Sequence, residues 1–415
     1  MLSVSEALTR ILANFQTLNS EVFPSESAVG RVLAETIRAS LDLPPFPNSS
    51  MDGYAVRAAD VRAATTQSPA TLAVIGDVPA GLLPTLEVKP GTAARIMTGA
   101  HLPDGADAVI PIEATDDQRS SLGGPVPASV QIMKPVDAGA YIRQAGEDVR
   151  AGDTVLSPGT LLRPYDLGVL AALGRAEVRV VRRPRVAVLS TGDELVDVNQ
   201  LPGPGQIRNV NSYTLAALVR KYGGEPVLLG VAPDDLEAVS QKLRSAVGQG
   251  VDVILSSAGV SVGAYDVVKS AVERDGELEF WKVNMRPGKP LAYGRVRGVP
   301  FFGLPGNPVS AIVGFEIFAR PAILKLGGHA RLDKPVVQAV LSEPFYSDGR
   351  ESYLRATVTR QDGVYVARSA GGQGSNIISA LTRSNAFVVM AEGVMEAPAG
   401  TVLNAWMLDW PEEVF

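Results

Sequence analysis

The sequence predicts a multidomain α/β protein, with a doubly wound parallel sheet in the middle of the chain and β-rich segments on either side. Two observations carry this prediction. Between residues 185 and 257, apolar runs of strand length alternate with amphipathic helical runs, which is the pattern of βαβ units in a parallel sheet. The flanking segments contain short apolar runs separated by Gly and Pro, which favours small β domains.

The chain begins with a helix signal and then changes to β texture. Ser3 and Glu6 form the Ser-x-x-Glu capping pattern, and the apolar residues after them recur at helical spacing. Together they predict an N-terminal amphipathic helix. Residues 47–150 consist of short apolar runs broken by turn residues and predict a β-rich lobe. A second helix is predicted over residues 164–173.

The middle of the chain carries the α/β pattern. Three apolar runs predict buried strands, and the segments between them present one apolar face at helical spacing. The predicted strands are RVAVLS, PVLLGV and VDVILSS, at residues 185–190, 226–231 and 251–257. Ligands of doubly wound sheets bind beyond the carboxyl ends of the strands, so a site is expected in the loops after these runs. Residues 333–415 return to short alternating runs and predict a separate C-terminal β domain.

Composition excludes several kinds of chemistry. The 415 residues include no cysteine and only two histidines, which excludes thiolate nucleophiles and cysteine-bound metals and disfavours a Ser-His-Asp triad. The net charge of −6 disfavours a nucleic-acid binder, because binding to phosphates requires a basic surface. No apolar run reaches the length of a membrane span, and the first residues lack the features of a secretory signal. We therefore expect a cytoplasmic protein that binds neither nucleic acid nor membrane.

Cations and carboxylates gather in the loops of the α/β region. The stretch WKVNMRPGKPLAYG places Lys282, Arg286 and Lys289 around a Pro-Gly turn, where three positive charges can converge on an anion. Asp and Glu residues near the strand ends offer the oxygen ligands that Mg²⁺ prefers. Each charge alone is explained by a helix cap or an exposed turn. Together they suggest Mg²⁺ with a phosphorylated or oxyanionic substrate.

Two Gly-containing loops lead from apolar strands into helices. SAGVSVGAYD, residues 257–266, could receive an oxyanion on its backbone amides or could be an ordinary strand-to-helix turn. GLPGNPVSA, residues 303–311, combines Asn307 at the predicted N-cap with Pro308 at the first helical position. Capping accounts for Asn307 but not for the preceding Pro-Gly pair, so this loop is the stronger candidate for a binding role.

The stretch PPFPNSSMDGYAV raises a separate question about Asp52. Its prolines disfavour helix, and an Asp-Gly step prefers a turn, so the loop is expected to be stiff and polar. The carboxylate is either a turn residue or a ligand. In the stretch RIMTGAHLPDGADAVI, we expect a turn at Thr98 and Gly99 and local hydrogen bonds for His101.

These stretches together resemble the molybdenum insertase family, which includes the bacterial MoeA proteins and the E domain of gephyrin. The matching motifs occur in the family's order: PPFPNSSMDGYAV, RIMTGAHLPDGADAVI, GEDV, LSTGDEL, SAGVSVGAYD, MRPGKP and GLPGNPVSA. The resemblance implies an elongated homodimer, with the active site between the α/β domain of one subunit and the β-rich lobe of the other. The implied domains are a discontinuous helical and β linker (1–46 and 152–183), the β-rich lobe (47–151), a molybdopterin-binding-like α/β domain (184–332) and a C-terminal β domain (333–415).

The resemblance also implies a reaction, the last step of molybdenum cofactor biosynthesis. Molybdate is inserted into the dithiolene of adenylylated molybdopterin with Mg²⁺, and AMP and molybdenum cofactor are released. The substrate's own sulfurs bind the molybdenum, so this chemistry needs no protein nucleophile. Transient contacts with other proteins of cofactor biosynthesis are implied as well.

Three alternatives stay open beside this reaction. A scaffold role, as in receptor clustering by gephyrin, is disfavoured because no long Pro/Ser-rich linker or additional N-terminal domain is expected here. The adenylyltransferase activity that makes the substrate would not require residues 47–150 or 333–415. Tungstate in place of molybdate is compatible with the sequence.

The resemblance assigns roles to four sets of residues. The set that faces the partner's site from the β-rich lobe is Asp52, Thr98 and Asp148. The carboxylates implied to bind Mg²⁺ or substrate are Glu194, Asp234 and Asp266. The cations implied to bind phosphate or molybdate are Lys282, Arg286 and Lys289. The set implied to shape the pterin and phosphate cradle is Gly259, Ser261, Gly263, Pro305, Gly306, Asn307 and Pro308.

Two positions depart from the family's pattern. Ala258 adds a methyl group where the family often has glycine, and Arg286 replaces a lysine that some members carry. The arginine keeps the charge but substitutes a planar fork for a point donor, so oxyanion binding is expected to persist with altered geometry. A substrate role for Arg355, Gln373 and Ser375, which lie in polar or Gly-rich segments, is a further expectation.

Overall fold

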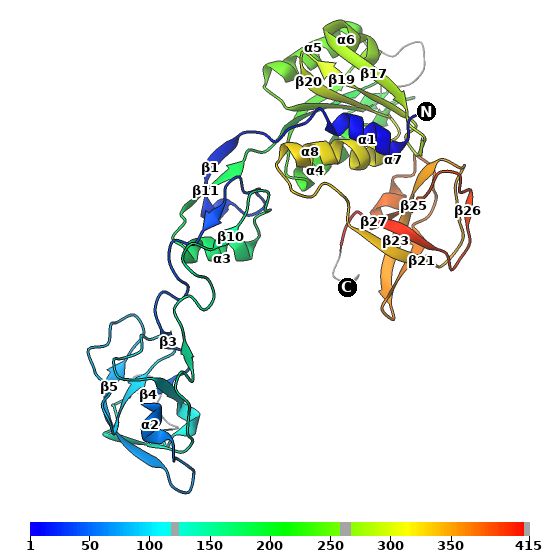
Figure 1. The fold of residues 1–415 in the computed structure, drawn as a ribbon. Helices are drawn as coiled ribbons and strands as arrows, with labels where there is room; N and C mark the ends of the chain where they lie inside the picture. The colour runs from blue at the N-terminus through cyan, green and yellow to red at the C-terminus, as the bar shows by residue number, and fades with distance from the viewer. Residues whose placement is uncertain (118–123, 258–266, 411–415) are drawn as a thin grey trace. The chain divides into compact units, whose positions relative to one another are not determined.

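The contacts within the chain divide it into two units. The computed structural model describes residues 1–117, 124–257 and 267–410. One unit, here called the α/β unit, comprises Met1–Ala34, Pro158–Arg163 and Glu177–Phe415; the other, here called the lobe unit, comprises Glu35–Ser157 and Pro164–Ala176 (Figure 1). The four domain boundaries expected from the sequence stay a prediction.

A six-stranded sheet forms the centre of the α/β unit, with the strand order β15-β12-β16-β20-β19-β17. The strands are β12 (Arg185–Thr191), β15 (Glu225–Ala232), β16 (Val253–Ser257), β17 (Gly276–Lys282), β19 (Pro290–Val296) and β20 (Val299–Leu304). The first four in the order are parallel to one another, as predicted. The sheet as a whole is mixed, because β19 is antiparallel to both β17 and β20. The short 283–289 connection between β17 and β19 permits a hairpin but no crossover.

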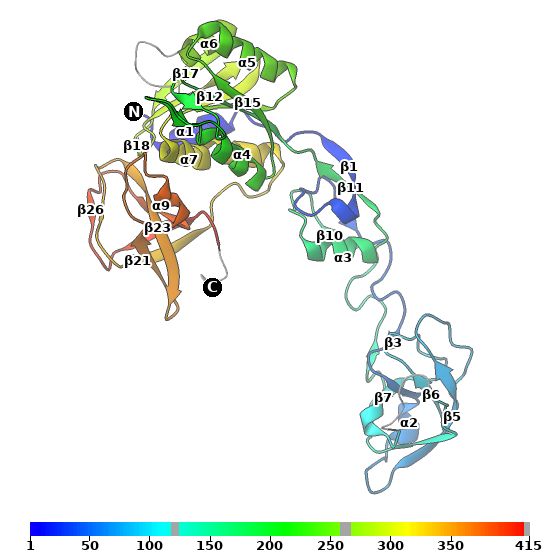
Figure 2. The same cartoon turned by 180° about the vertical axis from the view of Figure 1, so that it is seen from behind.

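Helices cover both faces of this sheet (Figures 1 and 2). One face packs against α1 (Val4–Leu12), α4 (Asn211–Lys221) and the continuous helical run of α7 (Pro308–Gly314), the π-helical segment η3 (Phe315–Ala319) and α8 (Arg320–Leu326). The other face packs against α5 (Leu236–Gly248) and α6 (Val267–Asp275). Strand β12 sends Val186 and Val188 into the first core and Ala187 and Leu189 into the second. This alternation confirms the doubly wound arrangement.

Helix α1 begins with the predicted capping box. The Glu6 amide donates to the Ser3 hydroxyl, and the Ser3 amide donates to the Glu6 carboxylate. Ala7 and Ile11 are buried in the core that α1 shares with the sheet. The start of the chain is therefore part of the α/β core. A short antiparallel pair, β1 (Ser20–Pro24) with β11 (Glu177–Val181), belongs to the same unit.

The C-terminal segment forms the predicted β domain. Five strands close into a ring through the pairing of β23 with β25, namely β21 (Val336–Leu341), β23 (Glu351–Gln361), β24 (Val364–Ser369), β25 (Ala386–Met390) and β27 (Val402–Met407). Leu354 and Ala356 of β23 face the interior of this barrel. Side chains alternate along a strand, so Tyr353 and Arg355 face outward, and Tyr353 joins the α/β core. The barrel thus presents one face of β23 to the α/β domain.

The lobe unit contains the predicted β-rich segment. Its five-stranded sheet has the order β7-β4-β6-β5-β8. These strands are β4 (Gly53–Val56), β5 (Ala70–Val78), β6 (Thr92–Ile96), β7 (Ala108–Pro111) and β8 (Ser129–Ile132). The unit also holds β2 (Ile37–Arg38), β3 (Asn48–Ser49), α2 (Ala58–Val61), β9 (Ile142–Arg143), β10 (Thr154–Leu156) and the predicted second helix, α3 (Pro164–Ala172). Tyr54 and Ile110 pack in its core.

The remaining short elements lie in loops. They are β13 (Leu195–Val196), β14 (Ile207–Arg208), β18 (Met285–Arg286), β22 (Phe345–Tyr346), α9 (Ser379–Thr382), β26 (Glu396–Ala397) and the 3-10 turns η1 (Ser25–Ser27) and η2 (Ile112–Ala114). Within the three described ranges, none of the helices combines the length and apolar composition that crossing a membrane requires.

Candidate functional site

One edge of the α/β sheet collects most of the predicted site residues. Glu194 follows the end of β12, Asp234 follows β15, and residues 305–308 follow β20. Lys282 at the end of β17 pairs with Pro290 at the start of β19, and β19 is antiparallel to β20. The hairpin loop that carries Lys289 therefore reaches the same edge as the carboxyl ends of the parallel strands. This is the edge at which doubly wound sheets bind ligands.

Part of this edge is not described by the structure. The candidate residues Gly259, Ser261, Gly263 and Asp266, and the departure at Ala258, lie outside the described residues. Their roles stay predictions.

Three carboxylates crowd the loops after β12 and β15. The Asp234 amide donates to Asp193 Oδ1 at 3.1 Å. Burial raises the pKa of Asp234, and the negative charges of Asp193 and Glu194 raise it further. Gly192 permits this crowding, since it has a φ of +146° and a Cβ there would lie 2.4 Å from Glu194 Oε2. Asp193 is one of the loop carboxylates that the sequence suggests for cation binding, although the resemblance assigns it no role.

The carboxylates alone do not complete a metal site. Among the described residues, no group of three or more His, Cys, Asp or Glu side chains is arranged to hold a metal ion. Mg²⁺ commonly binds to one or two carboxylates and takes its remaining ligands from water and substrate phosphates. Like charges at Asp193, Glu194 and Asp234 repel one another, and a divalent cation would relieve that repulsion. The donor set therefore fits Mg²⁺ held jointly by protein and substrate.

A buried hydroxyl network lies beneath this edge. Ser190 Oγ lies 2.8 Å from Ser212 Oγ and 2.9 Å from Ser257 Oγ, and donates to Asn209 Oδ1 at 3.1 Å. These hydrogen bonds fix the ends of β12 and β16 and the start of α4 relative to one another. Thr191 Oγ1 is buried there and has no hydrogen-bond partner among the residues that the structure describes. The sequence signal for this network is that both buried strands end in hydroxyl residues, as LST and LSS.

The GLPGNP loop connects the sheet to the barrel. Asn307 occupies the predicted N-cap position of α7, and Pro308 is the first helical residue. The expected capping hydrogen bond is wrong, however, because the Asn307 side chain makes none to the helix. Its amide group donates instead to Ser375 Oγ at 3.1 Å, and the Val309 amide donates to the Ser375 carbonyl. Asn211 Nδ2 holds the Gly306 carbonyl at 2.8 Å.

Arg355 lies buried beside this junction. Its side chain is fully buried, and Nη2 donates to the carbonyls of Gly372 and Gly374 at 2.9 and 3.1 Å. Nε and Nη1 are buried and have no hydrogen-bond partner among the described residues. Burial first and the charge of Arg286 second lower the pKa of Arg355 to about 10, so it remains a cation at neutral pH. Two unpaired donors on a buried cation make Arg355 the group most in need of an anionic partner at this edge.

The charge of Arg286 acts on Arg355, since it is the second cause, after burial, of the lowered pKa of Arg355. Strand β18 pairs with β23, which sets Arg286 opposite Ser352, three residues before Arg355. The turn at Gly288 brings this loop against α7: its φ is +99°, and a Cβ there would lie 3.5 Å from the Ser310 carbonyl oxygen. Lys282 and Lys289 are exposed at the rim of the loop. Two arginines, Ser375 and the start of α7 therefore form one positively charged cluster.

The lobe unit holds the other predicted residues. Asp52 Oδ1 accepts hydrogen bonds from the Thr98 amide at 2.7 Å and from the Thr98 hydroxyl at 2.9 Å. Within the described residues, no hydrogen bond or ion pair joins the Asp148 carboxylate to either of them; the Asp148 amide donates to the Leu43 carbonyl. His101 makes its expected local hydrogen bond, to the Leu102 carbonyl. The structure thus pairs Asp52 with Thr98 and leaves Asp148 in a separate loop.

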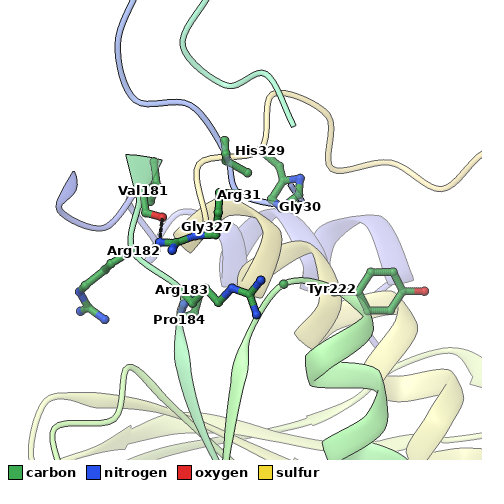
Figure 3. Close-up of a pocket in the computed structure, with 11 residues that line it drawn as sticks. Gly30, Arg31, Val181, Arg182, Arg183, Pro184, Tyr222, Gly327 and His329 are labelled. Atoms are coloured by element: carbon green, nitrogen blue, oxygen red, sulfur yellow. Dashed lines mark hydrogen bonds between the residues drawn. The ribbon is translucent and has the colours of Figure 1, made fainter. Parts of the chain in front are cut away.

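A separate pocket lies where β12 and β15 begin, at the opposite edge of the sheet (Figure 3). Arg31, Arg183 and His329 line it, and Arg31 is already paired with Glu21 and with the Val181 carbonyl. Its volume of about 10 Å³ matches a single water molecule. None of the predicted site residues lines it.

Known protein families and relatives match this chain along nearly its whole length. Family models match residues 2–174 (MoeA N-terminal region, domain I and II), 187–325 (probable molybdopterin binding domain) and 338–408 (MoeA C-terminal region, domain IV). Molybdopterin molybdenumtransferase 2 of Mycobacterium tuberculosis is 43% identical over 416 residues, covering 98% of this chain and 100% of that protein. The molybdopterin molybdenumtransferase of Haemophilus influenzae is 38% identical over 417 residues, covering 97% and 98%.

A solved structure supports the same assignment. The crystal structure of the molybdopterin biosynthesis moeA protein from Pyrococcus horikoshii OT3 superposes with a TM-score of 0.83 at 33% identity, covering 98% of this chain and 100% of that one. The identities and coverage extend over both units. The chain therefore belongs to the MoeA family of molybdopterin molybdenumtransferases.

Proposed function

We propose that this chain inserts molybdate into adenylylated molybdopterin and releases AMP and molybdenum cofactor. The observation that carries the proposal is the buried Arg355 near Arg286 and the Ser375 loop, because its Nε and Nη1 find no partner in the part of the chain that the structure describes. A tetrahedral dianion offers oxygen acceptors to several donors at once, and two guanidinium groups would balance its charge. Membership of the MoeA family supports molybdate as that anion.

The proposed roles of the protein are binding, orientation and charge neutralisation. Arg355 and Arg286 hold the oxyanion, while Lys282 and Lys289 bind phosphate at the rim. Residues 305–308, together with Gly259, Ser261 and Gly263, shape the cradle for the pterin and phosphate. The substrate sulfurs bind the molybdenum, so no protein nucleophile is required, in agreement with a chain that has no cysteine. Positioning and electrostatic stabilisation are the terms that dominate such reactions.

Mg²⁺ is proposed to lie among the carboxylates of Glu194, Asp234 and Asp266. Bound there, it would neutralise charge on the pyrophosphate link as that link breaks. The raised pKa of Asp234 supports the proposal, because it reflects the like-charge repulsion that a cation relieves.

The proposed active form is a cytoplasmic homodimer that receives its substrate through transient contacts with other proteins of cofactor biosynthesis. In this dimer, Asp52 and Thr98 of one protomer complete the site of the other. Subunit mixing tests this arrangement with two variants, Asp52→Asn and Arg355→Met. Randomly mixed dimers contain about half heterodimers, each with one intact site, so about a quarter of wild-type activity should return. A mixture as inactive as its components contradicts a site shared between subunits.

The function itself is tested by AMP release from purified adenylylated molybdopterin. The assay compares Mg²⁺ with a chelator, and molybdate with tungstate and with neither anion. Release that requires both Mg²⁺ and molybdate is the expected result, and loss of release in Asp52→Ala places the lobe in the reaction. Release that occurs with tungstate and not with molybdate would identify tungstate as the substrate anion. No release under any condition would favour a binding or scaffold role.

A further inference from the structure

A buried charge cluster joins the α/β domain to the segment that enters the barrel. Glu316 Oε2 lies 2.7 Å from Lys334 Nζ and 3.6 Å from Arg320 Nε. The Tyr222 hydroxyl bridges the pair, donating to Glu316 at 2.9 Å and accepting from Lys334 Nζ at 2.7 Å. The side chains of Glu316 and Lys334 are 2% and 3% exposed. These four residues are here called the linker cluster.

The residues of the linker cluster come from helices of the α/β domain and from the segment that leads into the barrel. Tyr222 is the C-cap of α4, and Glu316 lies in the π-helical segment between α7 and α8. Tyr222 also lines the small pocket of Figure 3, where its hydroxyl group points away from the pocket. Lys334 stands two residues before β21 of the barrel. Interruptions of this π-helical kind occur frequently at functional sites.

The linker cluster holds the connecting segment at two points. Lys334 is bound by its side chain, and the carbonyl of Leu332 accepts a hydrogen bond from Arg320 Nη2 at 2.7 Å. The adjoining interface between the barrel and the α/β core is apolar and includes Tyr353 and Phe387. Apolar contact is non-directional and tolerates small shifts. A buried set of charges is satisfied in one arrangement only, because a shifted partner leaves a charge unpaired.

The helical run that carries Glu316 begins at the positively charged cluster described above, which is the proposed oxyanion site. Helix α7 starts at Pro308, where Asn307 and Val309 bond to Ser375 of the barrel, and it continues directly into the π-helical segment that holds Glu316. The barrel is therefore held against this helical run at the start of α7 and again at the linker cluster.

We propose that the linker cluster is a positioning device for the oxyanion site, fixing the register in which the barrel presents Arg355 and Ser375 to the start of α7. The proposal rests on the proposed function of that site. Its residues act through the barrel and touch no substrate. A purely stabilising role is the competing explanation, and the two roles predict different results when the charges are replaced. Exchange of a buried ion pair for apolar residues is often neutral or stabilising, whereas register would be lost.

The test compares Lys334→Met, the double variant Glu316→Leu with Lys334→Met, and the control Lys325→Met. The double variant removes one charge of each sign, and Arg320 keeps its hydrogen bonds to the Glu316 and Leu332 carbonyls, which protects the test against failure to fold. Lys325 lies on α8, and its Nζ donates to the Leu12 carbonyl of the N-terminal segment at 2.8 Å, so it holds α1 and not the barrel. Lys334→Arg keeps the positive charge and tests whether a cation at this position is enough to preserve wild-type behaviour.

Two measurements are made on each variant of the full chain. The first is the distance distribution between spin labels at Ala217→Cys on α4 and Val364→Cys on β24, two exposed positions in a chain without native cysteine. The second is molybdate-dependent AMP release. We expect both linker-cluster variants to broaden the distribution and to raise the KM for molybdate about tenfold, the loss of one charge-assisted contact, with kcat at saturation unchanged. Lys325→Met and Lys334→Arg should resemble wild type in both.

A narrow, wild-type distribution in the double variant overturns the proposal, and so does an equal broadening in Lys325→Met. A broadened distribution with unchanged KM overturns it as well, since register would then be irrelevant to the site. The label distances do not depend on activity. If AMP release by the wild-type chain does not depend on molybdate, the proposed function is refuted. The label distances still report on the linker cluster in that case, so the two failures can be distinguished.

Discussion

Replacing Arg355 with methionine should separate stability from function. The guanidinium is fully buried and donates to two carbonyls through Nη2, while Nε and Nη1 are unpaired within residues 1–117, 124–257 and 267–410. Burial and the charge of Arg286 lower its pKa from the usual arginine range to about 10. Arginine is a base, so a lower pKa in the folded chain than in the unfolded chain means that the charge destabilises the folded state. This cost is present in full at pH values below about 10, where Arg355 is charged in both states.

The size of the effect can be worked out from this pKa. One pKa unit corresponds to about 1.4 kcal/mol, so holding the Arg355 charge in the folded chain costs about 3 kcal/mol at neutral pH. Methionine removes that cost and keeps most of the volume. The lost hydrogen bonds to Gly372 and Gly374 offset part of the gain, although water can reach Gly372, which is exposed. We expect a free energy of unfolding within about 1 kcal/mol of wild type or higher.

Molybdate should then distinguish the two proteins. At a concentration of 100 times Kd, a ligand stabilises the folded state by about 2.7 kcal/mol, and Arg355→Met should lose this stabilisation. The assay is urea unfolding followed by tryptophan fluorescence, with and without molybdate, since Trp406 lies on a barrel strand and packs on Tyr353 at 5.1 Å. Arg360→Met, an exposed change on the same strand, is the matched control. A variant that loses several kcal/mol of stability, or that molybdate still stabilises as in wild type, refutes the reasoning.

Three further changes test separate parts of the account. Thr98→Val removes one of the two hydrogen bonds to Asp52 and should lower the free energy of unfolding of the lobe by about 1 kcal/mol, measured by urea denaturation; no change would show that the hydroxyl contact is dispensable. Gly288→Ala forces a side chain to a φ of +99° and should destabilise by about 1 to 3 kcal/mol, with weaker molybdate binding by calorimetry; a fully stable variant contradicts the strained turn. The pKa of Asp234 is raised, so acidification should weaken Mg²⁺ binding at a higher pH than for an ordinary aspartate. Asp193→Asn should move that loss to lower pH, and a calorimetric pH profile unmoved by the change argues against the coupling.

Local patterns were enough to predict most elements of the fold. The capping box predicted α1, and the alternation of apolar and amphipathic runs predicted β12, α4, β15, α5 and β16 in order. The antiparallel hairpin of β17 and β19 was not predicted, because the stretch that joins these strands was interpreted only as a loop of basic residues around a Pro-Gly turn. Pairing partners within the barrel depend on contacts distant in the chain, which a local pattern does not contain.

The candidate site was predicted by residue type more than by contact. Glu194 and Asp234 were placed correctly at strand ends, because a parallel sheet brings those ends to one edge. Asn307 is the N-cap residue of α7 as predicted, but its side chain makes no capping hydrogen bond and donates instead to Ser375, 68 positions away. The Arg355 donors that have no partner among the described residues could not be predicted, because they result from packing between the barrel and the α/β core.

Insertion of the metal into the pterin is the most direct test of the central claim. Purified protein, Mg²⁺, adenylylated molybdopterin and isotopically labelled molybdate are incubated, and molybdenum, pterin and AMP are quantified in the separated products. The account predicts equimolar AMP and pterin-bound molybdenum from wild type, and neither from Arg355→Met. AMP released without molybdenum in the pterin, or insertion that persists without Arg355, would contradict it.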